Sequence, residues 1–422
     1  MTATLLSLAW KSLANRRTTT LFTALTIALS VALLLGVEKI RSGARASFAT
    51  TVSGSDLIVG ARSGPTQLLL YTVFRLGAPT NNISWESYRE IAERPDVAWT
   101  IPLSLGDSHR GFRVLGTNGD YFRHFRYGRG RDLSFAQGRP FEDLFDAVLG
   151  AEVAQRHGYG LGDRIVLAHG AGRVNLNSHA DRPFRVSGIL ERTGTPVDRS
   201  VHVSLAAIEA IHIDWVDGMP PVAGTATGAD VLRDLDLTPR SITAFLVGLR
   251  SRIDVFQVQR DVNDYFEEPL LAILPGAALQ ALWDSLGTME AALFAISALA
   301  VISGLSGMMT VSLAGLNERR REIAVLRSVG ARPRDIFLLL VVESVSLAAL
   351  GGLLGLALVY GLLTGAQPFI ELHFGLFLPI LAPSAAEAAI LGSVLGAGLL
   401  AGCLPAYRAY RLTLADGLMV TT

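Results

Sequence analysis

Four long apolar segments constrain the fold of this chain more than any other feature. They are residues 18–37, 289–316, 336–362 and 386–404, each about 19 to 28 residues long. About 20 helical residues cross the hydrocarbon core of a bilayer. Charged residues make up only 18% of the 422 residues, against roughly 25% in an ordinary soluble domain. We therefore expect four transmembrane helices.

The first apolar segment has a second interpretation, a cleaved signal peptide. Lys11, Arg16 and Arg17 precede it, and Ala44-Arg45-Ala46 has the form of a signal-peptidase site. However, the apolar run ends near Val37, well short of that site. It is also longer than the usual core of about 7–15 residues. We favour a retained membrane anchor.

Basic residues predict the orientation of the segments, because short cytoplasmic flanks carry an excess of Lys and Arg. Three basic residues precede the first segment, six arginines lie within 317–335, and Arg408 and Arg411 follow the fourth segment. Residues 365–384 contain no Lys or Arg. Both termini and 317–335 are therefore expected in the cytoplasm. Residues 38–288 must then form one domain on the outer side.

The outer region has the pattern of a mixed α and β domain. A helix is expected over 84–94, with Ser84 at its start and Pro95 just past its end. Strands are expected at 111–116, 164–168, 184–190 and 200–204, and a strand leading into a helix at 147–157. The apolar stretch 67–74 is either part of the core, which we favour, or a loop that contacts lipid or cargo.

The link 317–335 combines six arginines with three acids between two apolar segments. Such a link cannot enter hydrocarbon and must lie at a membrane surface. Ile323, Leu326 and Val329 have helical spacing, and Gly330 and Pro333 are expected to end the helix. A rigid amphipathic helix at this place is typical of a docking element.

The sequence contains no P-loop, HExxH or GxSxG motif. The single cysteine, Cys403, excludes an intrachain disulfide and a CxxC metal site. We interpret the histidines as solvated loop residues, with zinc binding between His169 and His212 as the rival. The histidines are His109, His124, His157, His169, His179, His202, His212 and His373. A net charge of zero gives no reason to expect nucleic-acid binding.

Charged and small residues near the apolar segments have two interpretations each. Glu290 and Glu387 lie at outer edges, where water can reach them. Glu343 is either solvated near the cytoplasmic boundary or faces the bundle interior. Two small-xxx-small pairs serve either packing within one chain or a dimer seam. These pairs are Gly351 with Gly355, and Gly392 with Gly396.

The segment order, together with Glu-Arg-Arg-Arg-Glu-Ile-x-x-Leu-Arg-x-x-Gly-Ala at 318–331, resembles the MacB/FtsX-like permeases of bacterial ABC transporters. The C-terminal residues 405–418 are similar to the closing motif of that family, although Leu414 stands where proline is usual. The outer domain is also similar, notably at 111–116, 147–150 and 184–190.

The resemblance implies a bacterial inner-membrane protein with four transmembrane helices and an α+β periplasmic domain inserted between the first and second. The expected parts are a cytoplasmic N-terminus at 1–17, helix and stalk at 18–48, periplasmic domain at 49–285 with a β-rich insertion at about 105–190, stalk and helix at 286–316, coupling helix at 317–335, helix at 336–362, periplasmic loop at 363–385, helix at 386–404 and cytoplasmic tail at 405–422.

The resemblance also implies that the coupling helix sits in a groove on an ATPase subunit. The contacts would be made by Glu318, Arg319, Arg320, Arg321, Glu322, Leu326, Arg327, Gly330 and Ala331. ATP and Mg would bind to that partner chain, and we expect no cofactor, metal or catalytic residue here. The chain would transmit motion to its periplasmic domain and so export or extract a hydrophobic, peptide or lipoprotein cargo.

The expected partners are the ATPase in trans, membrane lipid and a second permease copy, in a homodimer or a related pair. Recruitment of a periplasmic adaptor and an outer-membrane channel stays open. The alternative function is that of an FtsX-like transmembrane signalling scaffold that activates a periplasmic partner.

Overall fold

The four apolar segments form long helices in the computed structural model. They lie in α2 (Arg17–Thr51), α10 (Pro275–Glu318), α12 (Pro333–Phe374) and α13 (Ala385–Arg411), and each is long and apolar enough to cross a membrane. The chain is thus a multi-pass membrane protein, as its composition predicted. Two shorter helices, α1 (Thr2–Asn15) and α11 (Arg320–Ser328), accompany them.

The structure describes residues 2–51, 54–128, 130–170, 178–215, 227–374 and 383–411. The chain divides into two units. The first, called here the helical unit, comprises residues 1–44, 287–370 and 378–422. The second, called the sheet unit, comprises 45–286 and 371–377. Parts of the expected periplasmic loop and cytoplasmic tail, 375–382 and 412–422, lie outside the described residues.

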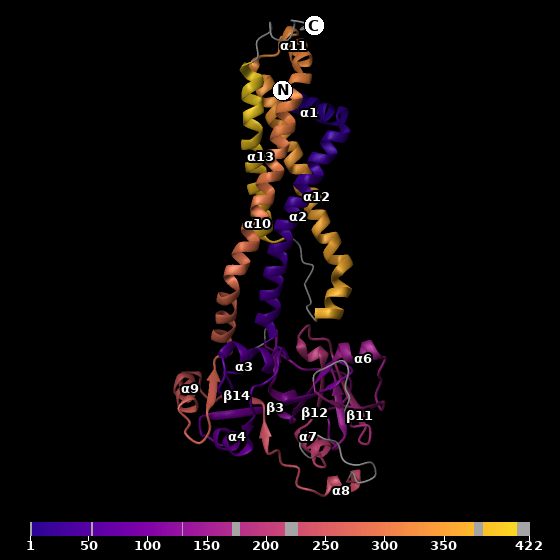
Figure 1. Ribbon diagram of the computed structural model, residues 1–422, viewed down its shortest axis with the longest axis vertical. Coiled ribbons are helices and arrows are strands. Elements are labelled where there is room, and N and C mark those ends of the chain that lie inside the picture. Colours follow the sequence, from indigo (N-terminus) through magenta and orange to yellow (C-terminus); the bar gives the residue numbers. More distant parts are fainter. Residues whose placement is uncertain are drawn as a thin grey trace. The chain divides into compact units, whose positions relative to one another are not determined.

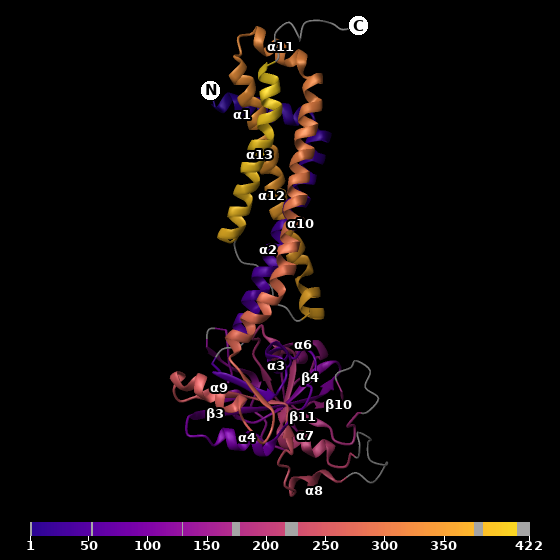
Figure 2. The ribbon, with the colours of Figure 1, turned by 60° about the vertical axis from the view of Figure 1, so that its left-hand side comes forward.

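The long helices run alongside one another in the helical unit (Figures 1 and 2), and small residues allow them to pack closely. A Cβ atom at Gly351 of α12 would lie 2.5 Å from Ile27 Cγ2 of α2, and one at Gly355 would lie 2.7 Å from the Ala28 carbonyl oxygen. Both glycines therefore pack within this chain, which is the first of the two interpretations. Gly398 and Gly402 of α13, which were not singled out, pack in the same way against α12.

The sequence between α10 and α12 forms a shorter helix than expected. α11 begins at Arg320, because the helix of α10 breaks at Arg319, and it ends at Ser328. Gly330 has φ +104°, a conformation that favours glycine, and turns the chain. Pro333 begins α12, where its fixed φ suits a first helical position. The proline thus starts the next helix, whereas the glycine alone lies at the end of α11.

The sheet unit is built on an eleven-stranded sheet with the order β15-β1-β14-β3-β4-β12-β8-β11-β7, in which β10 also pairs with β3 and β9 with β11. The strands of this sheet are β1 (Leu57–Ala61), β3 (Val97–His109), β4 (Phe112–Thr117), β7 (Phe135–Gly138), β8 (Asp146–Leu149), β9 (Arg164–Ile165), β10 (Ala168–His169), β11 (Phe184–Leu190), β12 (Ser200–Ser204), β14 (Ala244–Leu249) and β15 (Leu270–Ile273). Two short pairs join β2 (Ile83–Ser84) to β13 (Ser241–Ile242) and β5 (Arg126–Tyr127) to β6 (Arg131–Asp132).

Helices and short turns complete the sheet unit. They are α3 (Pro65–Thr72), α4 (Trp85–Ala92), α5 (Asp120–His124), α6 (Ala151–His157), η1 (Pro196–Arg199), α7 (Leu205–His212), α8 (Ala229–Arg233), η2 (Arg252–Asp254) and α9 (Val255–Asn263). The strands expected at 184–190 and 200–204 and the strand-to-helix segment at 147–157 are confirmed. Ser84 caps α4 as expected, because its hydroxyl accepts a hydrogen bond from the Ser87 amide.

The long strand β3 joins two halves of the sheet. Its first part pairs with β14, and its last part, from Ser104, pairs with β4. The strands on the β14 side come from distant parts of the sequence, whereas those on the β4 side lie within one stretch. That stretch reaches β12 and α7, because β12 pairs with both β4 and β8. The second half of the sheet therefore continues past the boundary expected near residue 190.

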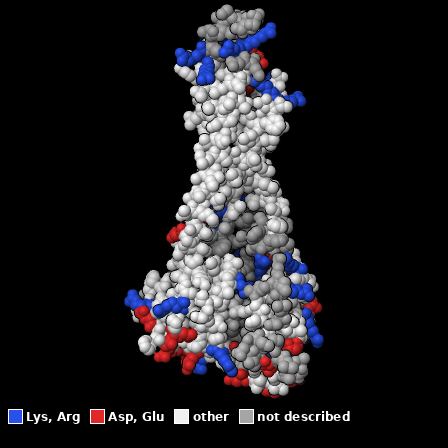
Figure 3. Space-filling model, in the orientation of Figure 1, with Lys and Arg blue, Asp and Glu red and all other residues white. Residues whose placement is uncertain are grey.

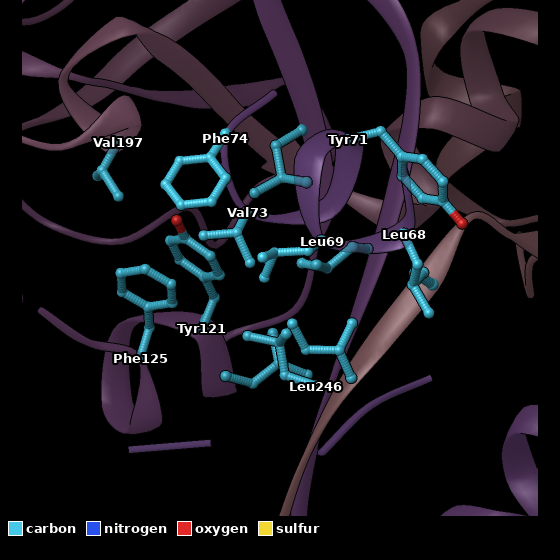
Figure 4. Close-up of a cluster of buried hydrophobic side chains, with 14 of the residues drawn as sticks. Leu68, Leu69, Tyr71, Val73, Phe74, Tyr121, Phe125, Val197 and Leu246 are labelled. Carbon is cyan, nitrogen blue, oxygen red and sulfur yellow. The ribbon is translucent and has the colours of Figure 1, made fainter. Parts of the chain in front are cut away.

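The apolar stretch 67–74 belongs to the core of the sheet unit. Leu68 and Leu69 of α3 are fully buried, and Phe74 packs in the same cluster. Figure 4 shows these side chains together with Tyr121 of α5 and with Phe125, the residue directly after α5. The interpretation as a core element is confirmed, and the stretch offers no lipid-contacting loop.

The glycine packing predicts a difference between two substitutions in α12. Gly351→Ala places a methyl group against Ile27, and such overpacking costs about 1–3 kcal/mol. Gly361→Ala in the same helix is the control, since its Cβ would have no described atom within 4 Å apart from its chain neighbours and its own helix backbone. Thermal unfolding of the purified protein should show a lower Tm for Gly351→Ala only. Equal Tm values would contradict the packing.

Candidate functional site

The helix α11 has one face packed on the helical unit. Ile323 and Ala324 are buried on that face. Ile323 packs in an apolar cluster with Leu316, Ile336, Leu340, Ala406 and Ala409 of the long helices. Because these side chains come from α10, α12 and α13, α11 rests on three helices at once. Such packing holds α11 as a rigid part of the helical unit.

The opposite face of α11 is exposed and combines apolar with charged side chains. Val325 and Val329, one helical turn apart, are 57% and 84% exposed. Arg320, Arg321 and Glu322 are exposed beside them. Figure 3 shows basic side chains gathered at this end of the helical unit, while the long middle stretch of the same face is uncharged. Two exposed valines framed by charges are suited to a protein contact.

Arg319, at the break between α10 and α11, is anchored inside the helical unit. Its guanidinium donates hydrogen bonds of 2.6 and 3.0 Å to the Glu343 carboxylate of α12, and another to the Ser12 hydroxyl of α1. Burial favours the neutral guanidine, but the hydrogen bonds and charge of Glu343 raise the pKa of Arg319 above its usual range. The guanidinium of Arg319 therefore stays protonated.

The Arg319–Glu343 ion pair changes two expectations. Glu343 is buried and faces the bundle, so its interpretation as a solvated boundary residue is wrong. Arg319 was grouped with the docking residues, but the structure places its side chain against α12 and α1. No sequence spacing connects residues 319 and 343, whose contact depends on how α10 and α12 pack.

The other residues of the expected docking set are distributed around α11. Leu326 and Arg327 are half-buried, and Leu326 lines a groove of about 570 Å³ with Glu322 and with Lys11 and Arg17 of the α1–α2 region. Gly330 and Ala331 lie in the turn before α12. The side chain of Glu318 is outside the described residues. Val325 was missed, although its place one turn before Val329 could have identified it.

A second buried ionic cluster joins three of the long helices. Lys39 Nζ of α2 lies 3.0 Å from Glu387 Oε1 of α13 and 3.0 Å from the Tyr360 hydroxyl of α12. The Tyr360 hydroxyl also donates to Glu387 Oε2 at 2.9 Å. Glu387 is only 2% exposed, so the expectation that water reaches it is wrong. Opposite charges at the ends of two apolar segments were the available signal.

Several histidines are buried, contrary to their interpretation as solvated loop residues. His109, His179 and His202 are at most 3% exposed. His202 and His109 each donate a hydrogen bond from ring atom Nδ1 to a backbone carbonyl oxygen, that of Val148 and that of Val166 respectively. His179 instead lies beside Asp107, in a group of side chains that could hold a metal ion.

Comparison with known proteins assigns the chain to a family. Residues 20–265 match the MacB-like periplasmic core domain, and residues 294–414 match the FtsX-like permease C-terminal domain. The chain belongs to the MacB/FtsX-like family of ABC transporter permeases. This family assignment agrees with the resemblance found in 318–331 and 405–418.

Two relatives illustrate the similarity of this permease to longer proteins. The macrolide export ATP-binding/permease protein MacB of Nitrobacter winogradskyi is 26% identical over 97% of this chain and 59% of its own length. The pyoverdine export ATP-binding/permease protein PvdT of Pseudomonas syringae pv. tomato is 25% identical over 83% and 50%. The chain thus spans about half to three-fifths of the length of these relatives.

The periplasmic region of MacB from Actinobacillus actinomycetemcomitans is similar over 54% of this chain and 93% of that one, with 11% identity and a TM-score of 0.33. The family assignment does not depend on that similarity.

The Arg319–Glu343 ion pair predicts non-additive stability effects. Glu343→Gln leaves a buried guanidinium without its counter-ion and should destabilise the permease by up to about 3 kcal/mol. Adding Arg319→Gln removes the unpaired charge, so the double variant should be more stable than Glu343→Gln alone. Thermal unfolding of the wild type, of Glu343→Gln, of Arg319→Gln and of the double variant measures this cycle. Additive losses would show that the two side chains do not interact.

Proposed function

We propose that this permease works with a separate ABC ATPase and transmits the motion of that ATPase through α11. The exposed face of α11, with Val325, Val329 and Arg321, is the docking surface. ATP and Mg bind to the partner chain, and this chain performs no chemistry. The observation that carries the proposal is that one face of α11, with Ile323 and Ala324, is buried, whereas the opposite face is exposed.

The proposed transmission follows from the contacts of α11. A force on its exposed face passes to α10, α12 and α13 through the apolar packing around Ile323. The Arg319–Glu343 ion pair adds a polar connection to α12, and Ser12 extends it to α1. Helices α2 and α10, of 35 and 44 residues, exceed the roughly 20 residues of a span and can carry motion beyond the bilayer.

The cargo proposed for this permease is hydrophobic, peptide or lipoprotein in nature, and it is exported or extracted on the periplasmic side of the inner membrane. Uncharged helix surfaces support movement of the cargo outside the bundle, since they offer no hydrophilic path. The export names of the relatives support this choice over a signalling scaffold. An assay of ATP hydrolysis separates export from scaffold function. Export predicts that cargo stimulates hydrolysis in the absence of any periplasmic hydrolase.

We further propose that two permease copies, identical or related, associate in the membrane. Gly392 and Gly396 of α13 support this arrangement, because a Cβ at either position would have no described atom within 4 Å apart from its chain neighbours and its own helix backbone. With Gly351 and Gly355 occupied by α2, this pair is the remaining small-residue surface of those considered. A periplasmic adaptor and an outer-membrane channel are further proposed partners.

The docking proposal predicts the effect of charges on α11. Replacing Val325 and Val329 with Asp puts two carboxylates into the contact, and their uncompensated desolvation should reduce ATPase binding at least about 100-fold. The measurement is vanadate-sensitive ATP hydrolysis that co-elutes with the permease purified from its native membranes.

The matched control for this experiment is Val231→Asp, because Val231 is a 55% exposed valine of the sheet unit. It should leave the co-eluting hydrolysis unchanged. Hydrolysis that persists in the double α11 variant at the wild-type level would reject α11 as the docking surface.

A further inference from the structure

Four side chains with metal-ligand atoms converge in the second half of the sheet. Asp107 is on β3, and His169, on β10, is its cross-strand partner. A bridge between Ala168 and Ser178 brings the next residue, His179, to the same place. His212, the last residue of α7, completes the group. Residues distant in sequence are thus collected by the sheet register and one helix end.

Three of the distances within this group are close to those of a tetrahedral metal site. The Asp107 Oδ1 atom lies 3.4 Å from His169 Nδ1, 3.5 Å from His212 Nε2 and 4.0 Å from His179 Nε2. His169 Nδ1 and His212 Nε2 are 3.2 Å apart, and all four ligand atoms lie within 4.8 Å of one another. Zinc bonds of about 2.0–2.1 Å in a tetrahedron separate the ligand atoms by about 3.3–3.4 Å.

Two of the four ligand atoms are buried polar atoms without a hydrogen bond. Asp107 and His179 are 2% and 1% exposed. Among the described residues, Asp107 Oδ1 and His179 Nε2 have no hydrogen-bond partner. A buried polar atom left unpaired costs about 1–3 kcal/mol, and more when it is charged. A cation held between these atoms would remove that cost.

A hydrogen bond made by the His212 ring suits metal coordination. The Nδ1 atom of His212 lies 2.8 Å from the Ile208 carbonyl oxygen, to which it can donate. The lone pair of its Nε2 atom is then directed at the group, as in zinc sites where a carbonyl orients the ligand.

Further contacts hold the ligand-bearing segments in place. Arg182, three residues after His179, donates hydrogen bonds to the Ala210 carbonyl of α7 and to Asp214. The Asp214 carboxylate also accepts from the amide and the hydroxyl of Thr227, at 2.8 and 2.7 Å. The Trp215 ring lies 4.7 Å from the His179 ring and forms an apolar wall. These contacts connect the segment that carries His179 to α7, which carries His212.

We propose that Asp107, His169, His179 and His212 bind one zinc ion. Three imidazoles and one carboxylate in a tetrahedral arrangement favour Zn²⁺ over Mg²⁺ or Ca²⁺, which prefer oxygen ligands. The ion ties β10, the segment around His179 and the end of α7 to β3, and so stabilises the second half of the sheet. This site is independent of ATPase docking at α11.

Zinc titration of the full-length protein tests the proposal. The permease is purified with an affinity tag free of histidine, and a chelator removes any bound metal. It is then titrated with Zn²⁺ alone, and binding is measured by calorimetry. We expect one equivalent to bind and to raise Tm. Co²⁺ in its place should give the intense d–d absorption of a tetrahedral site.

Substitutions identify the ligands. His169→Ala is the first variant, because this side chain is 47% exposed and its loss should not prevent folding. It should weaken zinc binding by at least about 10-fold and reduce the increase in Tm. His179→Ala should abolish binding. His124→Ala, whose ring stacks on Trp99 at 5.1 Å outside the group, should bind as the wild type does. Absence of stoichiometric binding, or equal binding by His169→Ala, would overturn the proposal.

Discussion

The Arg319–Glu343 ion pair is the interaction on which the end of the helical unit around α11 depends. A guanidinium and a carboxylate in a poorly solvated bundle attract each other more strongly than in water, and neither can leave without exposing the other to an apolar surrounding. The pair therefore fixes where α10 ends and how α11 begins. With Ser12 as a third member, it also fixes α1.

The rest of the helical unit follows the same physical logic. In an apolar environment, helices associate through close packing and a few buried polar contacts, because burial of apolar surface supplies no driving force there. Gly351 and Gly355 bring α12 against α2, and Gly398 and Gly402 bring α13 against α12. The cluster of Lys39, Tyr360 and Glu387 then connects these three helices by hydrogen bonds. A movement of one helix must disturb either a close contact or an ionic group.

Sequence patterns predicted much of this architecture because the bilayer imposes simple rules on composition and length. The four spans, their basic flanks and the strands at 184–190 and 200–204 each show a local pattern of apolar or β-forming residues. The sequence pattern identified only one of the two exposed valines on α11, because it placed Val329 on the apolar stripe but not Val325. Leu326, on the same stripe, is half-buried in a groove.

Contacts between distant segments could not be predicted in this way. The pairings of Arg319 with Glu343 and of Lys39 with Glu387 join residues 24 and 348 positions apart. The group around Asp107 depends on the pairing of β10 with β3 and on where α7 ends. No spacing rule for metal ligands applies, because the fold alone brings these residues together. The solvated interpretation of His179 was wrong for that reason.

The orientation of α11 is the most direct test of the proposed coupling. Val329→Cys, in a Cys403→Ser background, places one exposed thiol at the end of α11. A membrane-impermeant maleimide should label it in inverted membrane vesicles and not in intact spheroplasts. Val231→Cys in the sheet unit should show the opposite pattern. Labelling of Val329→Cys from outside intact spheroplasts would contradict the account, because α11 could not then meet a cytoplasmic ATPase.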